Sequence, residues 1–301
     1  MELVPEEIYL SINGIDICCF RWGKPAGRSV LLVHATGFHA RCWDQVIAEL
    51  PRDWNIVSVD MRGHGRSQKK GPYTWEQYGS DLVELTSQLA IKNAIGVGHS
   101  MGGYCVTQAA AILPDVLSDL VLVDPVIMAP EAYNNRLGAY TYDSIEDHPV
   151  ARRRGHFESW KDMFARYEHR SPYSLWDRKV FEDYCMHGVI PAADGKGVDL
   201  ACPGPVEASI YMGNFDSDLY DLIPHIDTPV VVLRAEPRDP ESQTMDFTAS
   251  PTWPQLASQF RHAQDVYLPE LTHFIPMQDP QLVADFIVAG AGVQPMQSGT
   301  E

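Results

Sequence analysis

Several features are missing from this 301-residue sequence, and each absence excludes a class of protein. No apolar run approaches the ~20 residues that a membrane-spanning helix needs. The N-terminal residues contain neither a basic nor an apolar segment of the kind found in signal peptides, so we expect a cytoplasmic protein. The six cysteines include no CxxC pair, and Cys18 and Cys19 are adjacent, which predicts free thiols rather than a disulfide framework.

Positive charge and cofactor motifs are also scarce. The sequence has 23 Lys and Arg against 40 Asp and Glu, a net charge of −17. Because such a surface repels phosphate, we expect neither nucleic acid nor a membrane as a partner. The sequence has no HExxH motif and no Cys/His ligand spacing, so we expect no metal. A dinucleotide fingerprint starting at Gly96 would need a third glycine where Met101 stands, and no other cofactor is indicated.

Strand and helix patterns alternate along most of the chain. An Asn13-Gly14 pair between two apolar segments predicts a hairpin near the N-terminus. Helical patterns begin after Thr74, after Ser100 and after Asp279. Short continuous apolar runs, typical of strands buried on both faces of a parallel sheet, lie at 30–33, 56–59, 94–98, 120–123 and 230–233. We therefore predict an α/β fold, with a mostly parallel central sheet covered by helices on both faces.

One stretch interrupts this alternation. Residues 127–220 contain several short helical patterns, many aromatic residues and no strand pattern. The sequence therefore predicts a helical subdomain at 127–220, inserted into a core domain made of residues 1–126 and 221–301.

A G-x-S-x-G motif lies at residues 98–102, where a predicted strand meets a predicted helix. This placement predicts a sharp turn that holds the hydroxyl of Ser100 clear of the sheet as a nucleophile. The backbone N–H of Met101, at the start of the helix, would point toward the anion formed by attack.

A nucleophilic serine needs a general base, and His273 is the strongest of the eleven histidines. It lies in a loop between a further predicted strand at 266–268 and the last predicted helix, at the sheet edge where Ser100 emerges. His99 adjoins Ser100 on a tight turn and is expected to face away from it. We expect structural or pocket roles for three other histidines on loops at this edge, His34, His39 and His64.

Together these residues resemble the α/β-hydrolase superfamily over nearly the whole chain. The resemblance rests on four motifs in order, at residues 34–38, 60–67, 98–103 and 272–277. It implies a helical cap at 127–220 and a second oxyanion-binding N–H at Thr36, although Ala35 replaces the usual glycine. It also implies that the 60–67 motif is structural, so neither Arg62 nor His64 is expected to be catalytic.

The resemblance also orders the catalytic residues as serine, acid and histidine along the chain. Asp239 follows the 230–233 strand at the correct sheet edge, and we predict it as the acid that orients His273. Glu236, on the same loop, is one alternative. Asp124, at the end of the 120–123 strand, is another, because some members of the fold take the acid from there.

Serine at position 100 favours acyl transfer, whereas relatives that open epoxides or remove halide carry aspartate there. We predict a serine hydrolase that cleaves carboxylic esters or lactones of a small, hydrophobic substrate through an acyl-enzyme on Ser100. Alternatives are a C–C bond hydrolase, an acyltransferase or perhydrolase, and a receptor-like binding protein with slow turnover. The basic run at 152–154 is expected to be a solvated surface. The oligomeric state stays open, with a homodimer as one option.

Overall fold

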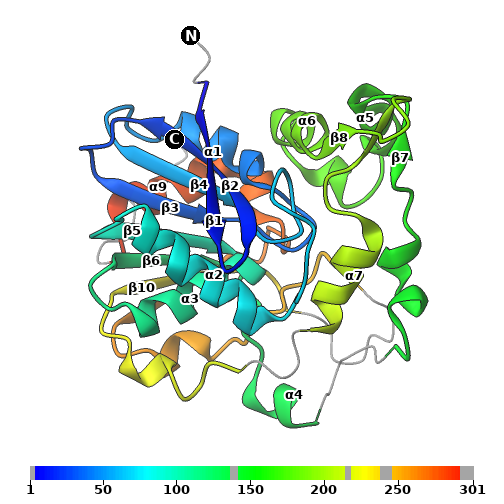
Figure 1. Cartoon of the computed structure of the whole chain (residues 1–301). Helices are drawn as coiled ribbons and strands as arrows, with labels where there is room; N and C mark the ends of the chain where they lie inside the picture. Colours follow the sequence, from blue (N-terminus) through cyan, green and yellow to red (C-terminus); the bar gives the residue numbers. More distant parts are fainter. Residues whose placement is uncertain (1–3, 136–141, 214–217, 238–245, 292–301) are drawn as a thin grey trace, which may run out of the picture.

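The computed structural model describes residues 4–135, 142–213, 218–237 and 246–291. Its main sheet has the strand order β1-β2-β4-β3-β5-β6-β10-β11 (Figure 1). The eight strands are β1 (Glu6–Ile12), β2 (Ile15–Gly23), β3 (Ser29–Val33), β4 (Asn55–Asp60), β5 (Ala94–His99), β6 (Leu117–Val123), β10 (Val230–Arg234) and β11 (Ala263–Tyr267).

The pairing of these strands makes the sheet mostly parallel. β1 pairs with β2, and β2 with β4, in antiparallel orientation, and every other neighbouring pair is parallel. Asn13 and Gly14 connect β1 to β2 with φ angles of 46° and 76°. Positive φ at both residues is what a tight hairpin turn requires, so the predicted hairpin is confirmed.

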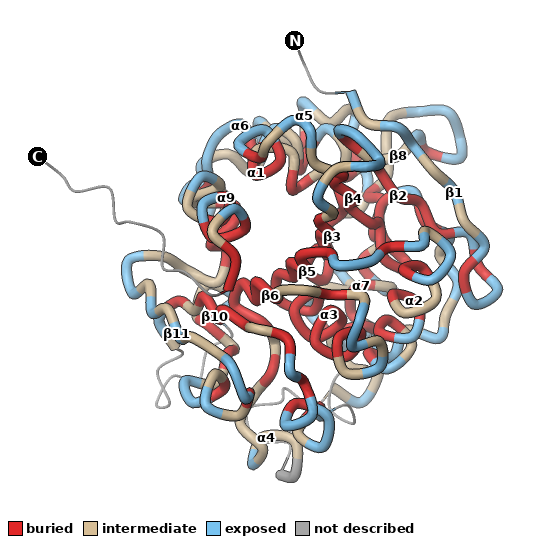
Figure 2. Tube along the Cα trace, turned by 90° about the vertical axis from the view of Figure 1, so that its left-hand side faces the viewer, coloured by how far each residue is buried: buried red, intermediate tan, exposed pale blue. Residues whose placement is uncertain are grey.

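Helices cover both faces of the sheet, and the buried side chains of single strands alternate between them. In β3, Leu31 and Val33 belong to one apolar cluster, whereas Val30 and Leu32 belong to another. Helices α2 (Trp75–Gln88) and α3 (Met101–Ile112) contribute to the first cluster. Helices α1 (Asp44–Ala48) and α9 (Pro280–Ala289) contribute to the second. Figure 2 shows the central strands between these two layers as buried, which confirms the predicted fold class.

Residues 142–213, between β6 and β10, lie beside the sheet in Figure 1, and we call residues 127–220 the inserted segment. Its α-helices are α4 (Pro130–Asn135), α5 (Trp160–Tyr167), α6 (Arg178–His187) and α7 (Gly204–Met212). Its short 3₁₀ helices are η2 (Ile145–Asp147), η3 (Pro149–Arg152) and η4 (Tyr173–Leu175).

The prediction that the inserted segment has no strands is wrong. A small antiparallel sheet in the order β7-β9-β8 is formed by β7 (His156–Phe157), β9 (Val198–Leu200) and β8 (Val189–Pro191). Strands of two or three residues are too short for a period-two pattern of apolar side chains, which is why the sequence did not reveal them.

The remaining short elements are η1 (Ala40–Trp43), η5 (Ile223–His225), η6 (Leu256–Gln259) and α8 (Ile275–Gln278). Within the described ranges, no helix combines the length and the apolar character needed to cross a bilayer.

Candidate active site

Ser100 lies on the sharp turn that the G-x-S-x-G motif predicts. It follows β5 directly, precedes α3, and has φ 58° and ψ −118°, a strained conformation for a residue with a side chain. The surrounding glycines make this turn possible. A Cβ atom on Gly98 would lie 2.3 Å from the backbone oxygen of Gly102, and one on Gly102 would lie 2.1 Å from the carbonyl oxygen of Val33.

A chain of hydrogen bonds joins Ser100 to His273 and Asp124. Nε2 of His273 lies 3.1 Å from Oγ of Ser100, and Nδ1 lies 2.6 Å from Oδ2 of Asp124. Because a carboxylate only accepts hydrogen bonds, this contact fits a His273 tautomer with its proton on Nδ1, in which Nε2 accepts a hydrogen bond from the Ser100 hydroxyl. All three groups are at least partly shielded from water, with 6% of Ser100 and none of the Asp124 side chain exposed.

Asp124 is held in place from its other side. It directly follows β6 and has a positive φ of 44°. Its Oδ1 accepts hydrogen bonds from the Ser250 hydroxyl at 2.6 Å and from the Ala235 N–H at 3.1 Å. These donors fix the orientation of the Asp124 carboxyl group. The arrangement therefore presents Oδ2 of a buried aspartate to the imidazole of His273.

The other two candidate acids are placed differently. Glu236 is exposed, and its carboxylate accepts a hydrogen bond from the hydroxyl of Tyr267. Asp239, the acid favoured by the sequence, lies outside the described residues. Of the three candidate acids, Asp124 is the one that the structure describes as accepting a hydrogen bond from His273.

His99 has a positioning role that the sequence did not reveal. Its Nε2 lies 2.8 Å from the carbonyl oxygen of His273, so the residue before the nucleophile binds the backbone of the histidine loop. The N–H of His273 also donates to the carbonyl of Thr248 at 2.7 Å. Burial lowers the pKa of His99 well below its usual value, so its ring is neutral at physiological pH.

Two backbone N–H groups are candidates for binding an oxygen anion near Ser100. That of Met101 is next to Ser100 in the sequence, and that of Thr36 follows β3, the strand that neighbours β5 in the sheet. Met101 is the first residue of α3, where an N–H has no helical partner, and Thr36 follows β3 in a buried loop. Among the described residues, neither N–H donates a hydrogen bond, so both are available to an oxygen anion.

Two buried histidines fix the loop that carries Thr36. Nε2 of His64 accepts from the N–H of Gly37 at 3.0 Å, and Nε2 of His34 accepts from the N–H of Met61 at 3.0 Å. Burial lowers the pKa of both rings, which keeps them neutral and able to accept. His39 instead contacts the carbonyl of Tyr184 in the inserted segment at 3.1 Å.

Next to these groups is a cavity of about 290 Å³ between the sheet loops and the inserted segment. The sheet loops contribute Gly37, which follows Thr36, and Phe274, which follows His273. The lining is rich in aromatic side chains: Phe38, Tyr173, Trp176, Tyr184, Tyr211, Phe247 and Phe274. Trp176 packs its ring 5.2 Å from that of Phe274 and 5.6 Å from that of Phe38.

The arginine run at 152–154 is only partly a solvated surface, in contrast to the prediction. Arg152 and Arg154 are exposed, but Arg153 lines the cavity. Its Nη2 forms an ion pair with Oε2 of Glu207 at 2.8 Å and donates to the carbonyl of Cys202 at 3.2 Å. Side-chain exposure is 25% for Arg153 and 7% for Glu207.

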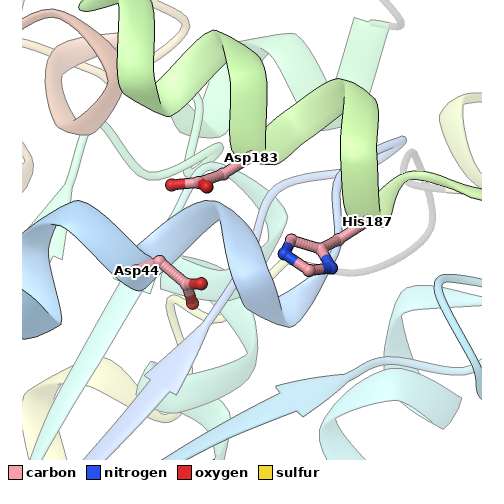
Figure 3. A group of neighbouring side chains, drawn as sticks. All are labelled: Asp44, Asp183 and His187. Atoms are coloured by element: carbon pink, nitrogen blue, oxygen red, sulfur yellow. The ribbon is translucent and has the colours of Figure 1, made fainter. Parts of the chain in front are cut away.

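A second polar cluster lies where α1 meets α6 (Figure 3). Asp44, Asp183 and His187 each offer one ligand atom, and these atoms lie within 4.8 Å of one another. The Asp44 carboxylate already binds Arg41, at 2.6 Å, and that of Asp183 accepts from Gln45 at 2.6 Å. The hydrogen bond from Gln45 to Asp183 joins α1 to α6 of the inserted segment.

Comparisons with known proteins give the family. A sequence model of the alpha/beta hydrolase family matches residues 30–286. Lipase LipV of Mycobacterium tuberculosis is 34% identical over 113 residues, which are 38% of this chain and 43% of that protein. The bifunctional esterase/perhydrolase DCH of Acinetobacter calcoaceticus is 22% identical over 92% of this chain and 96% of that protein. The match to lipase LipV therefore spans less than half of that protein.

Solved structures agree on the fold. That of E-2-(acetamidomethylene)succinate hydrolase has a TM-score of 0.74, 23% identity, and covers 96% of this chain and 100% of that one. An enol-lactonase from Burkholderia xenovorans has a TM-score of 0.65, 22% identity, and covers 93% and 98%. At these identities the likeness concerns the fold alone. The predicted family is confirmed by the match over residues 30–286: the chain belongs to the alpha/beta hydrolase family.

Proposed function

We propose that the protein is a serine hydrolase that cleaves carboxylic esters or lactones through an acyl-enzyme on Ser100. The observation that carries the proposal is the hydrogen-bonded chain from Asp124 through His273 to Ser100, with Ser100 on a strained turn. Family relatives named as a lipase and as an esterase/perhydrolase support the substrate class.

In the proposed reaction, His273 acts first as a base and then as an acid. Nε2 takes the Ser100 proton as Oγ attacks the ester carbonyl, and the carbonyl π electrons move to its oxygen. Nε2–H then protonates the departing alcohol as the C–O bond breaks, which leaves the acyl-enzyme. Water attacks this ester with the same base, and Ser100 leaves with the proton. Asp124 holds the reactive tautomer of His273 and stabilises the imidazolium.

The oxyanion of the tetrahedral intermediate is proposed to bind the N–H groups of Thr36 and Met101. The Met101 N–H also lies at the positive end of the α3 dipole. Removing one such donor typically costs about 10²- to 10³-fold in kcat. We assign Asp124 rather than Asp239 as the acid because Asp124 accepts the Nδ1 hydrogen bond at 2.6 Å.

We further propose that residues 127–220 form a cap over a core made of 1–126 and 221–301. The apolar cluster that holds much of the inserted segment together also contains Phe38, Phe274 and Met277 of the core. The cavity between the two parts, with its aromatic lining, suits the hydrophobic portion of an ester.

A fluorophosphonate probe tests the proposal without knowledge of the natural substrate. We expect one adduct by intact mass in the wild-type protein and none in Ser100→Ala. Ser80→Ala removes an exposed serine on α2 and is the matched control, which should label like the wild type. Labelling that persists in Ser100→Ala, or a wild-type protein that resists the probe, would contradict an activated Ser100.

A perhydrolase reaction is a second candidate, favoured by the similarity to DCH over 92% of this chain. The acyl-enzyme would then be attacked by hydrogen peroxide in place of water and would release a peracid. Competition between water and peroxide, with peracid measured as the product, separates the two acceptors. Peracid formation that is lost in Ser100→Ala would establish this second activity.

A further inference from the structure

Arg153 and Glu207 are the two charged residues among those that line the cavity. They come from different parts of the inserted segment, Arg153 from the end of η3 and Glu207 from α7. Both are largely buried, and the remaining lining is aromatic or aliphatic apart from tyrosine hydroxyls and Gly37. An ion pair in such surroundings costs desolvation free energy, so its presence beside the proposed active site calls for a role.

The pair lies close to the proposed oxyanion site. A Cβ atom on Gly37 would lie 2.4 Å from Oε1 of Glu207, so this carboxylate rests against the residue that follows Thr36. Adjacent residues are ~3.8 Å apart, so a group bound by the pair would lie a few bonds from the scissile carbonyl. The positive φ of Gly37, 81°, and this contact together explain why glycine occupies position 37.

The ion pair uses only part of the hydrogen-bonding capacity of each partner. Nη2 of Arg153 contacts Oε2 of Glu207 and the carbonyl of Cys202. Within the described part of the chain, Nε of Arg153 and Oε2 of Glu207 are buried and make no hydrogen bond. One donor and one acceptor are therefore left over at the same wall of the cavity.

The charges of Arg153 and Glu207 determine which kind of ligand group can bind beside them in the cavity. Arg153 and Glu207 cancel, so a carboxylate would gain little from the guanidinium and would be repelled by Oε1. A cation would be repelled by Arg153. A purely apolar group would remove water from both polar atoms without replacing its hydrogen bonds. An uncharged group that both accepts and donates avoids all three penalties.

We propose that Arg153 and Glu207 form a subsite for an amide or hydroxyl group of the substrate, which accepts from the Arg153 guanidinium and donates to the Glu207 carboxylate. The inference rests on the proposed function, since it concerns the ester that Ser100 attacks. It gives the substrate class as a flat, aromatic or otherwise hydrophobic ester or lactone with one neutral polar group near the scissile bond.

Two series of aryl esters test the subsite, methyl benzoates and phenyl acetates, each with a para carboxamide, carboxylate or isopropyl group. These substituents are similar in shape and differ in charge and hydrogen bonding. In the series whose ring enters the cavity, we expect kcat/KM for the carboxamide to exceed both others by about 10- to 100-fold, the usual effect of hydrogen bonds to charged groups. A preference for the carboxylate would overturn the proposal in favour of an anion site.

A double substitution removes both charges of the Arg153–Glu207 ion pair, so that neither charge is left buried without its partner. Arg153→Met combined with Glu207→Gln keeps the volumes and should reduce the carboxamide preference to about threefold or less. Arg152→Met, on the exposed neighbour, is the control and should keep the preference. A preference that survives the double substitution, or an absence of preference in the wild type, would contradict the subsite.

Binding measurements keep the test independent of turnover and of how the variants fold. Calorimetric titration of the wild-type protein with benzamide, benzoate and toluene should give the lowest Kd for benzamide, by about tenfold. If the probe fails to label Ser100 and no ester is cleaved, the proposed function fails while the benzamide titration still decides the subsite. If Ser100 labels normally and benzamide binds no better than toluene, only the subsite fails.

Discussion

The sheet edge and the inserted segment hold their residues in different ways. Ser100 and Asp124 directly follow β5 and β6, and backbone hydrogen bonds to Val123 and Leu233 fix both. The cavity residues of the inserted segment lie on short helices and are held mainly by ring contacts of 5–6 Å, such as those of Trp176. Backbone ladders fix atoms more tightly than ring packing does. We therefore expect changes at the sheet edge to alter kcat and changes in the inserted segment to alter KM.

The largest effect is expected from a substitution at the sheet edge. Asp124→Asn should lower kcat by about 10³- to 10⁴-fold, because an asparagine side chain can turn its amide toward Nδ1 and favour the wrong tautomer. The measurement is kcat on an aryl ester, with circular dichroism to check the fold. Glu236→Gln and Asp239→Asn are the matched controls and should change kcat little. A comparable loss in Asp239→Asn with an active Asp124→Asn would refute our choice of acid.

The sequence revealed the sheet edge better than the inserted segment, for physical reasons. Ser100 and His273 follow from a motif and from strand ends that share one edge of a parallel sheet. The acid could not be chosen this way, because Asp124, Glu236 and Asp239 all follow strands that end at that edge. The choice depends on local features such as the positive φ of Asp124 and the donors on Ser250 and Ala235, which no periodicity encodes.

In the inserted segment, the sequence pattern gave short helices but missed the strands β7 to β9 and the burial of Arg153. The pairing of Arg153 with Glu207 joins two helices distant in the chain, and each residue taken alone reads as a solvated charge. The contacts that shape the cavity are long-range side-chain contacts, so hydrophobic patterning within one helix cannot predict them.

A second prediction compares two glycines, one in each region. Gly102→Ala places a Cβ atom 2.1 Å from the carbonyl oxygen of Val33, and neither backbone can move away easily. We expect a loss of about 3 kcal/mol in the free energy of unfolding, as for an overpacked core, measured by urea denaturation. Gly155→Ala in the inserted segment meets nothing within 4 Å and should change stability little. Equal stability of the two variants would mean that the turn at Ser100 is less tightly packed than the structure indicates.

The third prediction concerns a substitution in the inserted segment and its effect on KM. Trp176→Leu removes an aromatic wall of the cavity and should raise KM for an aryl ester by about tenfold, the usual size of an aromatic contact, with kcat nearly unchanged. Trp160→Leu, on α5 and outside the cavity lining, is the control. The measurement is the separate determination of kcat and KM for an aryl and a short alkyl ester. A fall in kcat with constant KM would show that this residue acts on the chemical step.

The smallest expected effect concerns the contact between the two regions, at Asp183 on α6. Burial raises the pKa of Asp183 to about 7, so the folded protein favours the protonated carboxyl group. The unfolded chain releases that proton near pH 4. The contribution of Asp183 to the free energy of unfolding is therefore fully present below pH 4 and is lost as the pH rises through 7. Burial also lowers the pKa of His187 to about 3, so no histidine cation compensates the carboxylate at pH 8.

Asp183→Asn removes this ionisation and keeps an oxygen for the hydrogen bond from Gln45. Because Asp183 is only partly buried, we expect a modest gain in Tm, about 2 °C at pH 8, and less at pH 5. Glu182→Gln changes the net charge equally at an exposed neighbour on the same helix and corrects for the general effect of removing one negative charge. A difference in Tm between Asp183→Asn and the wild type that stays constant from pH 5 to 8 would mean that Asp183 titrates alike in the folded and unfolded states. The contact of α6 with the sheet layer would then be insensitive to pH in this range.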